Sequence, residues 1–200
     1  MKKCLLLALT GAVIAGSVTL APSRVAAQQV PLTDREEDIV DAYQVMQAVT
    51  MGLLGVTALG GTVQLYNLPT ALGDGACARG EAILGDYACN HHASLLHGIA
   101  GIATIASYTA TQALALSAPN LDQGDEDTVT DVLGVVHGVG IGLTGALGLA
   151  AANPGLFGLS GNAASDFSRT LRTVHWLVAL VTAGAFATHM AVDYIGPASF

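Results

Sequence analysis

The chain has 200 residues, of which 52% are hydrophobic and only 11% are charged, and its formal net charge is −8. Soluble domains carry about 25% charged residues, so this composition favours a membrane protein, with a length typical of one domain. The negative charge excludes nucleic-acid binding as the main function, because no basic patch is present to release counterions from phosphates.

The N-terminal segment is typical of a secretory signal peptide. Two lysines precede an apolar run of about a dozen residues, and small residues before Gln28 offer a cleavage site. We expect a cleaved signal peptide over residues 1–27, followed by an acidic extracytoplasmic segment over residues 28–42. An uncleaved membrane anchor is the alternative. In both cases residue 28 starts on the outer side of the membrane.

Four apolar stretches follow, and each has the ~20 residues that a membrane helix needs. They cover residues 43–68, 92–118, 128–152 and 171–194. Each break between them contains a proline, as expected for connections between helices. The predicted fold is therefore all-α, a transmembrane four-helix bundle over residues 43–200 that follows the cleavable signal peptide.

The arginines predict how the bundle is oriented. Arg79, Arg169 and Arg172 fall in the first and third connections. In the mature chain, only Arg35 falls in a segment expected on the opposite side of the membrane. Cytoplasmic loops carry the excess of lysine and arginine. We therefore expect a multi-pass protein of a bacterial-type cell membrane, with both ends of the mature chain extracytoplasmic.

Two cysteines in the first connection conflict with this orientation. Cys77 and Cys89 are twelve residues apart, which is a plausible spacing for a disulfide. Disulfides belong to oxidising compartments, so a bridge here would place the first connection outside the cytoplasm. Free thiols are the alternative, and the sequence leaves both open.

Four of the six histidines fall inside the predicted spans, where ionisable residues are costly and usually functional. His175 and His189 are fourteen residues apart on the last span, which is about 21 Å along a helix and close to one face. The depths of His97 and His137 on the second and third spans match these two levels. The spacing predicts two transverse pairs, His97 with His175 and His137 with His189.

A pair of imidazoles from facing helices can hold one haem iron. His97 and His137 are each followed by glycine, and small residues beside a histidine would leave room for a flat macrocycle. Gly101 lies one turn beyond His97, and Gly134 lies on the face of His137. We expect these two glycines to line the cofactor, and the histidines to be axial ligands of two haem b groups, or of one.

This histidine pattern over residues 92–194 resembles the di-haem transmembrane cytochromes b, including the small four-helix electron carriers. In respiratory cytochrome b, two helices each carry two histidines at a similar spacing. Here only one helix carries two, and the other two come from separate helices. The resemblance implies transmembrane electron transfer, as a membrane cytochrome or as the cytochrome subunit of a redox complex. The redox partner would be a soluble cytochrome or a quinone. The acidic outer segments could dock a basic partner such as a soluble cytochrome, and solvated acidic loops are the simpler alternative.

Two other functions remain open. Histidines inside a bundle could bind or transport copper, zinc or iron directly, or they could only join helices in a structural subunit of a membrane complex. The sequence has no nucleotide-binding glycine loop and no Gly-x-Ser-x-Gly motif. We expect an electron carrier or oxidoreductase subunit rather than a stand-alone enzyme.

The remaining polar and aromatic residues near the span ends have simpler interpretations. His91 and His92 are expected as a solvated pair at the start of the second span, with a metal or quinone contact as the alternative. The aromatic residues near the span ends, Tyr108 and Trp176 among them, are expected in interfacial belts.

Overall fold

The structure is a computed structural model that describes residues 33–117 and 128–195, and the regular elements within these ranges are helices. The long helices are α2 (Asp34–Asn67), α4 (His91–Ser117), α5 (Thr128–Ala152) and α6 (Gly161–Ile195). The short helices η1 (Cys77–Arg79), α3 (Asp86–Cys89) and η2 (Pro154–Phe157) lie in the connections. The four long helices are long and apolar enough to cross a membrane, as the sequence predicts. The predicted signal peptide lies outside the described residues.

α2 begins at Asp34, well before the predicted start near residue 43. The backbone N–H of Thr33 donates to the Glu36 carboxylate at 2.8 Å, and the Thr33 hydroxyl accepts from the Glu36 backbone N–H at 3.4 Å. Such a capping box satisfies free N–H groups at a helix start, and acidic residues there suit the helix dipole. The predicted acidic segment 28–42 is therefore helical from residue 34 onward.

α6 also begins earlier than predicted, at Gly161 rather than near residue 171. The added turns are polar, but they are anchored by Phe167, whose ring centre lies 5.2 Å from that of Phe157 in η2. This contact between helix and connection was not visible in the hydropathy pattern. The predicted third connection is correspondingly short.

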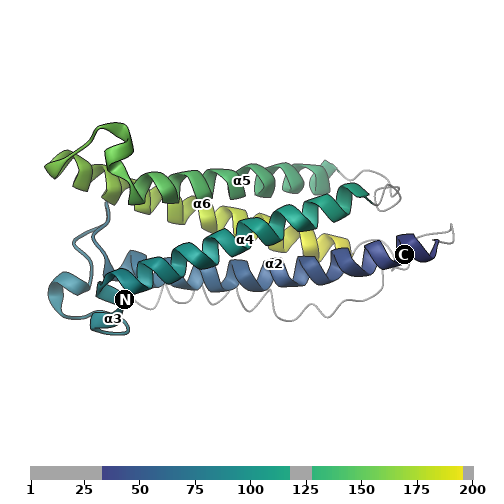
Figure 1. Ribbon diagram of the computed structural model, residues 1–200, viewed down its shortest axis with the longest axis horizontal. Helices are drawn as coiled ribbons and strands as arrows, with labels where there is room; N and C mark the ends of the chain where they lie inside the picture. Colours follow the sequence, from purple (N-terminus) through teal and green to yellow (C-terminus); the bar gives the residue numbers. More distant parts are fainter. Residues whose placement is uncertain (1–32, 118–127, 196–200) are drawn as a thin grey trace.

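The four helices pack as two antiparallel pairs (Figure 1). α2 lies along α4, and α5 lies along α6 in the most extensive helix contact of the described bundle. α2 also packs against α6, while α4 and α5 touch over a smaller area. α4 and α6 each neighbour both α2 and α5, so they lie diagonally across the bundle. This arrangement determines which histidine pairs cross the bundle and which join neighbouring helices.

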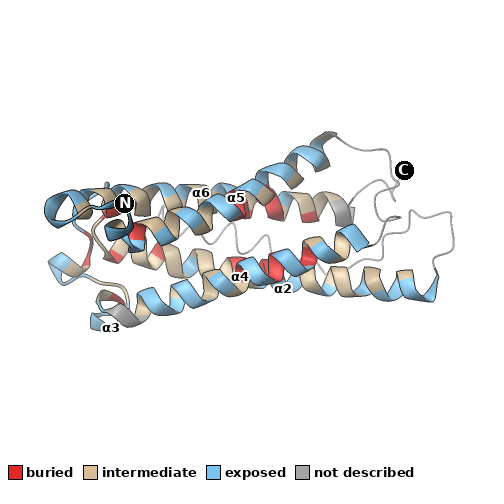
Figure 2. Cartoon of the chain, turned by 45° about the horizontal axis from the view of Figure 1, so that its top comes forward, coloured by how far each residue is buried: buried red, intermediate tan, exposed pale blue. Residues whose placement is uncertain are grey.

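The interior of the bundle is rich in small polar residues, and its exterior is apolar. Thr50 of α2 is fully buried, and its hydroxyl lies 2.7 Å from that of Ser107 and 3.0 Å from that of Thr111, both on α4. Large apolar side chains instead point outward along the helices, among them Val45, Val56, Ile99, Ile102, Val135, Val139, Leu143 and Val181. Buried residues gather where the helices face one another (Figure 2). A soluble bundle would have the opposite distribution.

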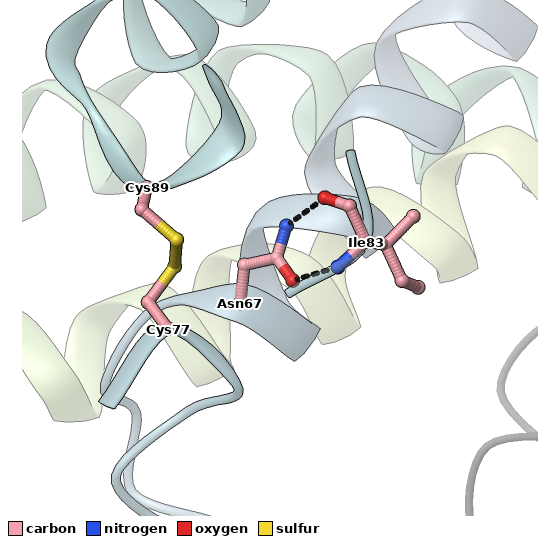
Figure 3. The surroundings of a disulfide bond; sticks show 4 residues. All are labelled: Asn67, Cys77, Ile83 and Cys89. Atoms are coloured by element: carbon pink, nitrogen blue, oxygen red, sulfur yellow. Dashed lines mark hydrogen bonds between the residues drawn. A yellow bond between two sulfur atoms is a disulfide. The ribbon is translucent and has the colours of Figure 1, made fainter. Parts of the chain in front are cut away.

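The connection between α2 and α4, residues 68–90, folds into a compact structure that we call the cap. Cys77 and Cys89 form a disulfide within it. The fully buried Asn67 side chain both donates to the Ile83 carbonyl and accepts from the Ile83 N–H, each at 2.9 Å (Figure 3). Gly75 has φ +79°, and a Cβ there would overlap the backbone of Asn67 and its neighbour. The first connection is therefore a structured element rather than a simple loop.

The cap is docked onto α6. Arg172 donates from Nη1 to the Pro69 carbonyl at 2.8 Å, and the Ala71 N–H donates to the Thr173 hydroxyl at 3.2 Å. Nη1 of Arg169 lies 3.4 Å from the Asp74 carboxylate. These contacts hold the cap over the end of the bundle nearest to His175.

Candidate functional site: two histidine pairs

The structure brings the four membrane-span histidines together in the two pairs predicted from depth. His97 of α4 faces His175 of α6, and His137 of α5 contacts His189 of α6. The first pair lies toward the end that carries the cap and η2, which we call the loop end. The second lies toward the end where α2 begins and α6 terminates, which we call the terminal end. The two pairs differ in geometry.

The loop-end pair is open. The ring centres of His97 and His175 lie 6.0 Å apart, with the ring planes nearly perpendicular at 87°. Two metal–imidazole bonds of about 2 Å place the ligand nitrogens about 4 Å apart. A ring nitrogen lies about 1 Å from its ring centre, so this separation has room for a metal bound by both rings. Because α4 and α6 are diagonal neighbours, the pair spans the centre of the bundle.

Contacts with α5, and a hydrogen bond of the adjacent Trp176, fix the orientation of His175. Its Nδ1 lies 2.8 Å from the Thr144 carbonyl oxygen, which leaves Nε2 as the free ring nitrogen. A Cβ at Gly148 would lie 3.0 Å from His175 Cε1, so glycine allows the ring to lie against α5. The adjacent Trp176 donates from Nε1 to the Thr62 hydroxyl of α2 at 3.1 Å. Metal-binding histidines commonly donate their second ring nitrogen to a carbonyl in this way.

His97 lies against α2 rather than α5. A Cβ at Gly61 would lie 3.1 Å from His97 Cε1, and one at Gly60 would lie 3.4 Å from Nδ1. The Thr57 backbone is close enough to interact with this ring electrostatically. Nδ1 of His97 and the hydroxyl of Thr144 are both buried. Among the described residues, neither atom has a hydrogen bond of ordinary geometry. Buried polar atoms normally have partners, so these two atoms are exceptions within the described bundle.

The terminal-end pair is closed. Nε2 of His137 lies 2.6 Å from Nδ1 of His189, and the ring centres are 4.9 Å apart. Nδ1 of His137 lies 2.9 Å from the Tyr108 hydroxyl of α4. The His137 side chain is almost fully buried, with 2% of its surface exposed. The two nitrogens are in direct hydrogen-bond contact, so no metal ion fits between them in this arrangement.

Packed side chains enclose this second pair. The Phe186 ring centre lies 5.2 Å from that of His137, and the Tyr108 ring centre lies 5.6 Å from it. Both rings belong to a buried core cluster that also contains Met51, Leu54, Ile141 and Met190. The main apolar core thus lies beside the terminal-end pair, and it fills the space that a flat macrocycle would need there.

The two glycines expected to line the cofactor, Gly101 and Gly134, lie in different settings from each other. A Cβ at Gly101 would meet nothing within 4 Å, so the space beside it is open. A Cβ at Gly134 would lie 3.7 Å from His189 Cε1, so Gly134 packs against the histidine of the neighbouring helix.

Sequence reasoning missed two glycines and two hydrogen-bond partners. Gly60 and Gly61 contact His97 from α2, a helix without histidines, and their adjacency in an apolar helix was the available signal. Thr144 acts through its backbone carbonyl, for which the sequence carries no signal. Tyr108 was expected in an interfacial belt, but it is buried and bonded to His137. Trp176 likewise makes an internal hydrogen bond.

The remaining histidines and the direct metal-binding alternative have less support. α4 begins at His91, and the side chains of His91 and His92 lie outside the described residues. In the part of the chain that the structure describes, no three histidine, cysteine or acidic side chains gather into a group that could hold a metal ion. A site for a bare metal ion would therefore have two protein ligands there.

Comparisons with known proteins gave no match, whether with protein-family models, with curated proteins or with solved structures.

Proposed function

We propose that the protein is a membrane cytochrome b in which His97 and His175 are the axial ligands of a haem b. It would transfer electrons as a carrier, or as the cytochrome subunit of a larger redox complex. The observation that supports this most directly is the loop-end pair, whose ring centres are 6.0 Å apart across the bundle. Bound haem would supply one-electron chemistry, while the protein orients the group and adjusts its potential.

The chain's own residues have distinct parts in this proposal. The Thr144 carbonyl keeps Nδ1 of His175 engaged, so that Nε2 is presented to the iron. Gly60, Gly61 and Gly148 let both imidazoles lie close to helix backbones. The unpaired Nδ1 of His97 has capacity for a hydrogen bond once the ring is drawn toward a ligand. With His97 and His175 both holding the group, the site would favour electron transfer over the binding of a substrate.

The membrane location rests on the distribution of side chains. Four apolar helices are long enough to cross a bilayer, and their outward faces carry large apolar residues. Threonine, serine and histidine lie inside, where hydrogen bonds between helices replace contacts with water. The redox partner would be a soluble cytochrome, a quinone or another subunit, and the lipid bilayer would be the solvent of the bundle.

The cap suggests an orientation opposite to the one that the arginines predict. We propose that the loop end, with the Cys77–Cys89 disulfide, faces the oxidising compartment, because disulfides persist there and not in the cytoplasm. Arg169 and Arg172 at this end are engaged with Asp74 and the Pro69 carbonyl. Their positions therefore have a structural explanation that does not depend on membrane orientation.

A visible difference spectrum of the detergent-solubilised protein, reduced minus oxidised, tests the function. Haem content would be measured as pyridine haemochrome per chain. We expect haem b in the wild-type protein and its loss in both His97→Ala and His175→Ala. Val181→Ala is the matched control, because Val181 is exposed on the same helix as His175 and should leave the spectrum unchanged. Absence of haem from protein produced with haem available would contradict the proposal.

A further inference from the structure

We infer that His137 and His189 do not hold a second haem. Together with Tyr108 they form a hydrogen-bonded trio that joins α4, α5 and α6, and the chain binds one haem. The number of haems rests on the proposed function, whereas the trio is defined by hydrogen bonds independently of any cofactor. The two histidine pairs, equivalent by sequence depth, would then have different roles.

The first argument is the distance between the nitrogens. An iron bound by two imidazoles needs them about 4 Å apart, whereas Nε2 of His137 and Nδ1 of His189 are separated by 2.6 Å. The loop-end pair provides an internal comparison in the same molecule. There the ring centres are 6.0 Å apart, against 4.9 Å at the terminal end. The loop-end rings are thus the more widely separated pair, and only the terminal-end nitrogens are in hydrogen-bond contact among the described histidine pairs.

The second argument is which helices would have to move. His137 and His189 lie on α5 and α6, which share the most extensive helix contact in the described bundle. Gly140 of α5 lies directly against the Thr182 side chain of α6, where even a Cβ would overlap. Widening the pair would separate this close-packed interface. His97 and His175 lie on the diagonal helices α4 and α6, which share no comparably extensive interface within the described bundle.

The third argument is that the surrounding space is filled. A macrocycle between His137 and His189 would lie perpendicular to the line joining their nitrogens. The rings of Phe186 and Tyr108 flank His137 and are themselves buried, with 3% and 8% of their surface exposed. Both would have to leave the apolar core. Core side chains that are close-packed move only at a substantial free-energy cost.

The two hydrogen bonds of the trio can be assigned to neutral side chains. If the Tyr108 hydroxyl donates to Nδ1 of His137, then the Nε2–H of His137 donates to Nδ1 of His189. This assignment needs no charged group, which suits the interior of a membrane helix bundle. It uses both nitrogens of His137. Binding iron through Nε2 would remove the donor on which the contact with His189 depends.

Haem counting in variants of each pair tests the inference. We expect one haem b per chain in the wild-type protein, its loss in His175→Ala, and its retention in His189→Ala and His189→Gln. The Gln variant can still accept a hydrogen bond from His137, so it should unfold at a higher temperature than the Ala variant. Two haems per wild-type chain, with one lost from His189→Gln, would overturn the inference and leave the proposed function standing.

A second measurement tests the trio without any cofactor. Thermal unfolding of Tyr108→Phe, His189→Ala and the double variant forms a double-mutant cycle. Because the two side chains act through His137, their effects on the unfolding temperature should be non-additive by about 2 °C or more. Additive effects would contradict the trio. A wild-type protein without haem would refute the proposed function, and this cycle would still decide whether the trio exists.

Discussion

Nδ1 of His175 lies 2.8 Å from the backbone carbonyl oxygen of Thr144, so α5, a helix that contributes no histidine to the loop-end pair, determines which nitrogen of His175 is free. α5 also provides Gly148, against which the same ring packs. The orientation of His175 therefore depends on the α5–α6 interface as much as on its own helix. Such supporting contacts typically change metal affinity by 10- to 100-fold when removed.

Gly148→Ala should weaken haem binding roughly tenfold or more. The new Cβ would lie 3.0 Å from Cε1 and 3.2 Å from Nδ1 of His175, so the ring must shift and its bond to Thr144 must lengthen. Haem titration of the apoprotein measures the change. Gly142→Ala is the control on the same helix, since its Cβ would meet nothing within 4 Å. Equal effects of the two variants would show that His175 does not depend on this contact.

The hydrogen bond between Trp176 and Thr62 should stabilise the packing of α6 on α2 by about 1 kcal/mol. Trp176→Phe and Thr62→Val each remove one partner of the 3.1 Å contact. Unfolding in mixed detergents, measured for both single variants and the double variant, gives the coupling free energy. A coupling near zero would mean that the indole is held by packing alone.

The disulfide of the cap should contribute about 2–4 kcal/mol to stability, because it closes a short loop in the unfolded chain. We expect a lower unfolding temperature for the Cys77→Ser, Cys89→Ser double variant and for wild-type protein treated with a reductant. The reductant should have no further effect on the double variant, which serves as its control. If reduction leaves the wild-type unfolding temperature unchanged, then the hydrogen bonds of Asn67 with Ile83 and the contacts of the cap with α6 hold the cap without the disulfide.

The proposed orientation predicts that the cap is accessible from outside the cell. In a Cys4→Ser background, a reductant followed by a membrane-impermeant thiol reagent should label Cys77 and Cys89 in intact cells. The start of α2 would then be cytoplasmic, on the side opposite to the one that the N-terminal segment predicts for residue 28. Labelling only after permeabilisation, together with a new N-terminus at Gln28, would instead support the orientation predicted from the arginines.

Much of the fold was predictable from the sequence because it depends on local properties. The rise and periodicity of a helix convert sequence distance into depth in the bundle and into position around the helix. The fourteen residues between His175 and His189 therefore predicted two depths, and at each depth the histidine lies beside the predicted partner. The apolar lengths gave the four helices, with α5 at its predicted bounds. The starts of α2 and α6 were wrong by several residues, because capping at Thr33 and the contact of Phe157 with Phe167 leave no trace in hydropathy.

The difference between the two histidine pairs was decided only by the tertiary structure. Depth along a helix says nothing about which helices are neighbours, since lateral order depends on the packing of whole helix faces. That packing placed His97 and His175 on diagonal helices with a gap, and His137 and His189 on adjacent helices in hydrogen-bond contact. It also brought Gly60 and Gly61 of α2 against His97. By itself the sequence determined the helices, the depths and the pairing, and the way the helices pack determined which pair has room for iron.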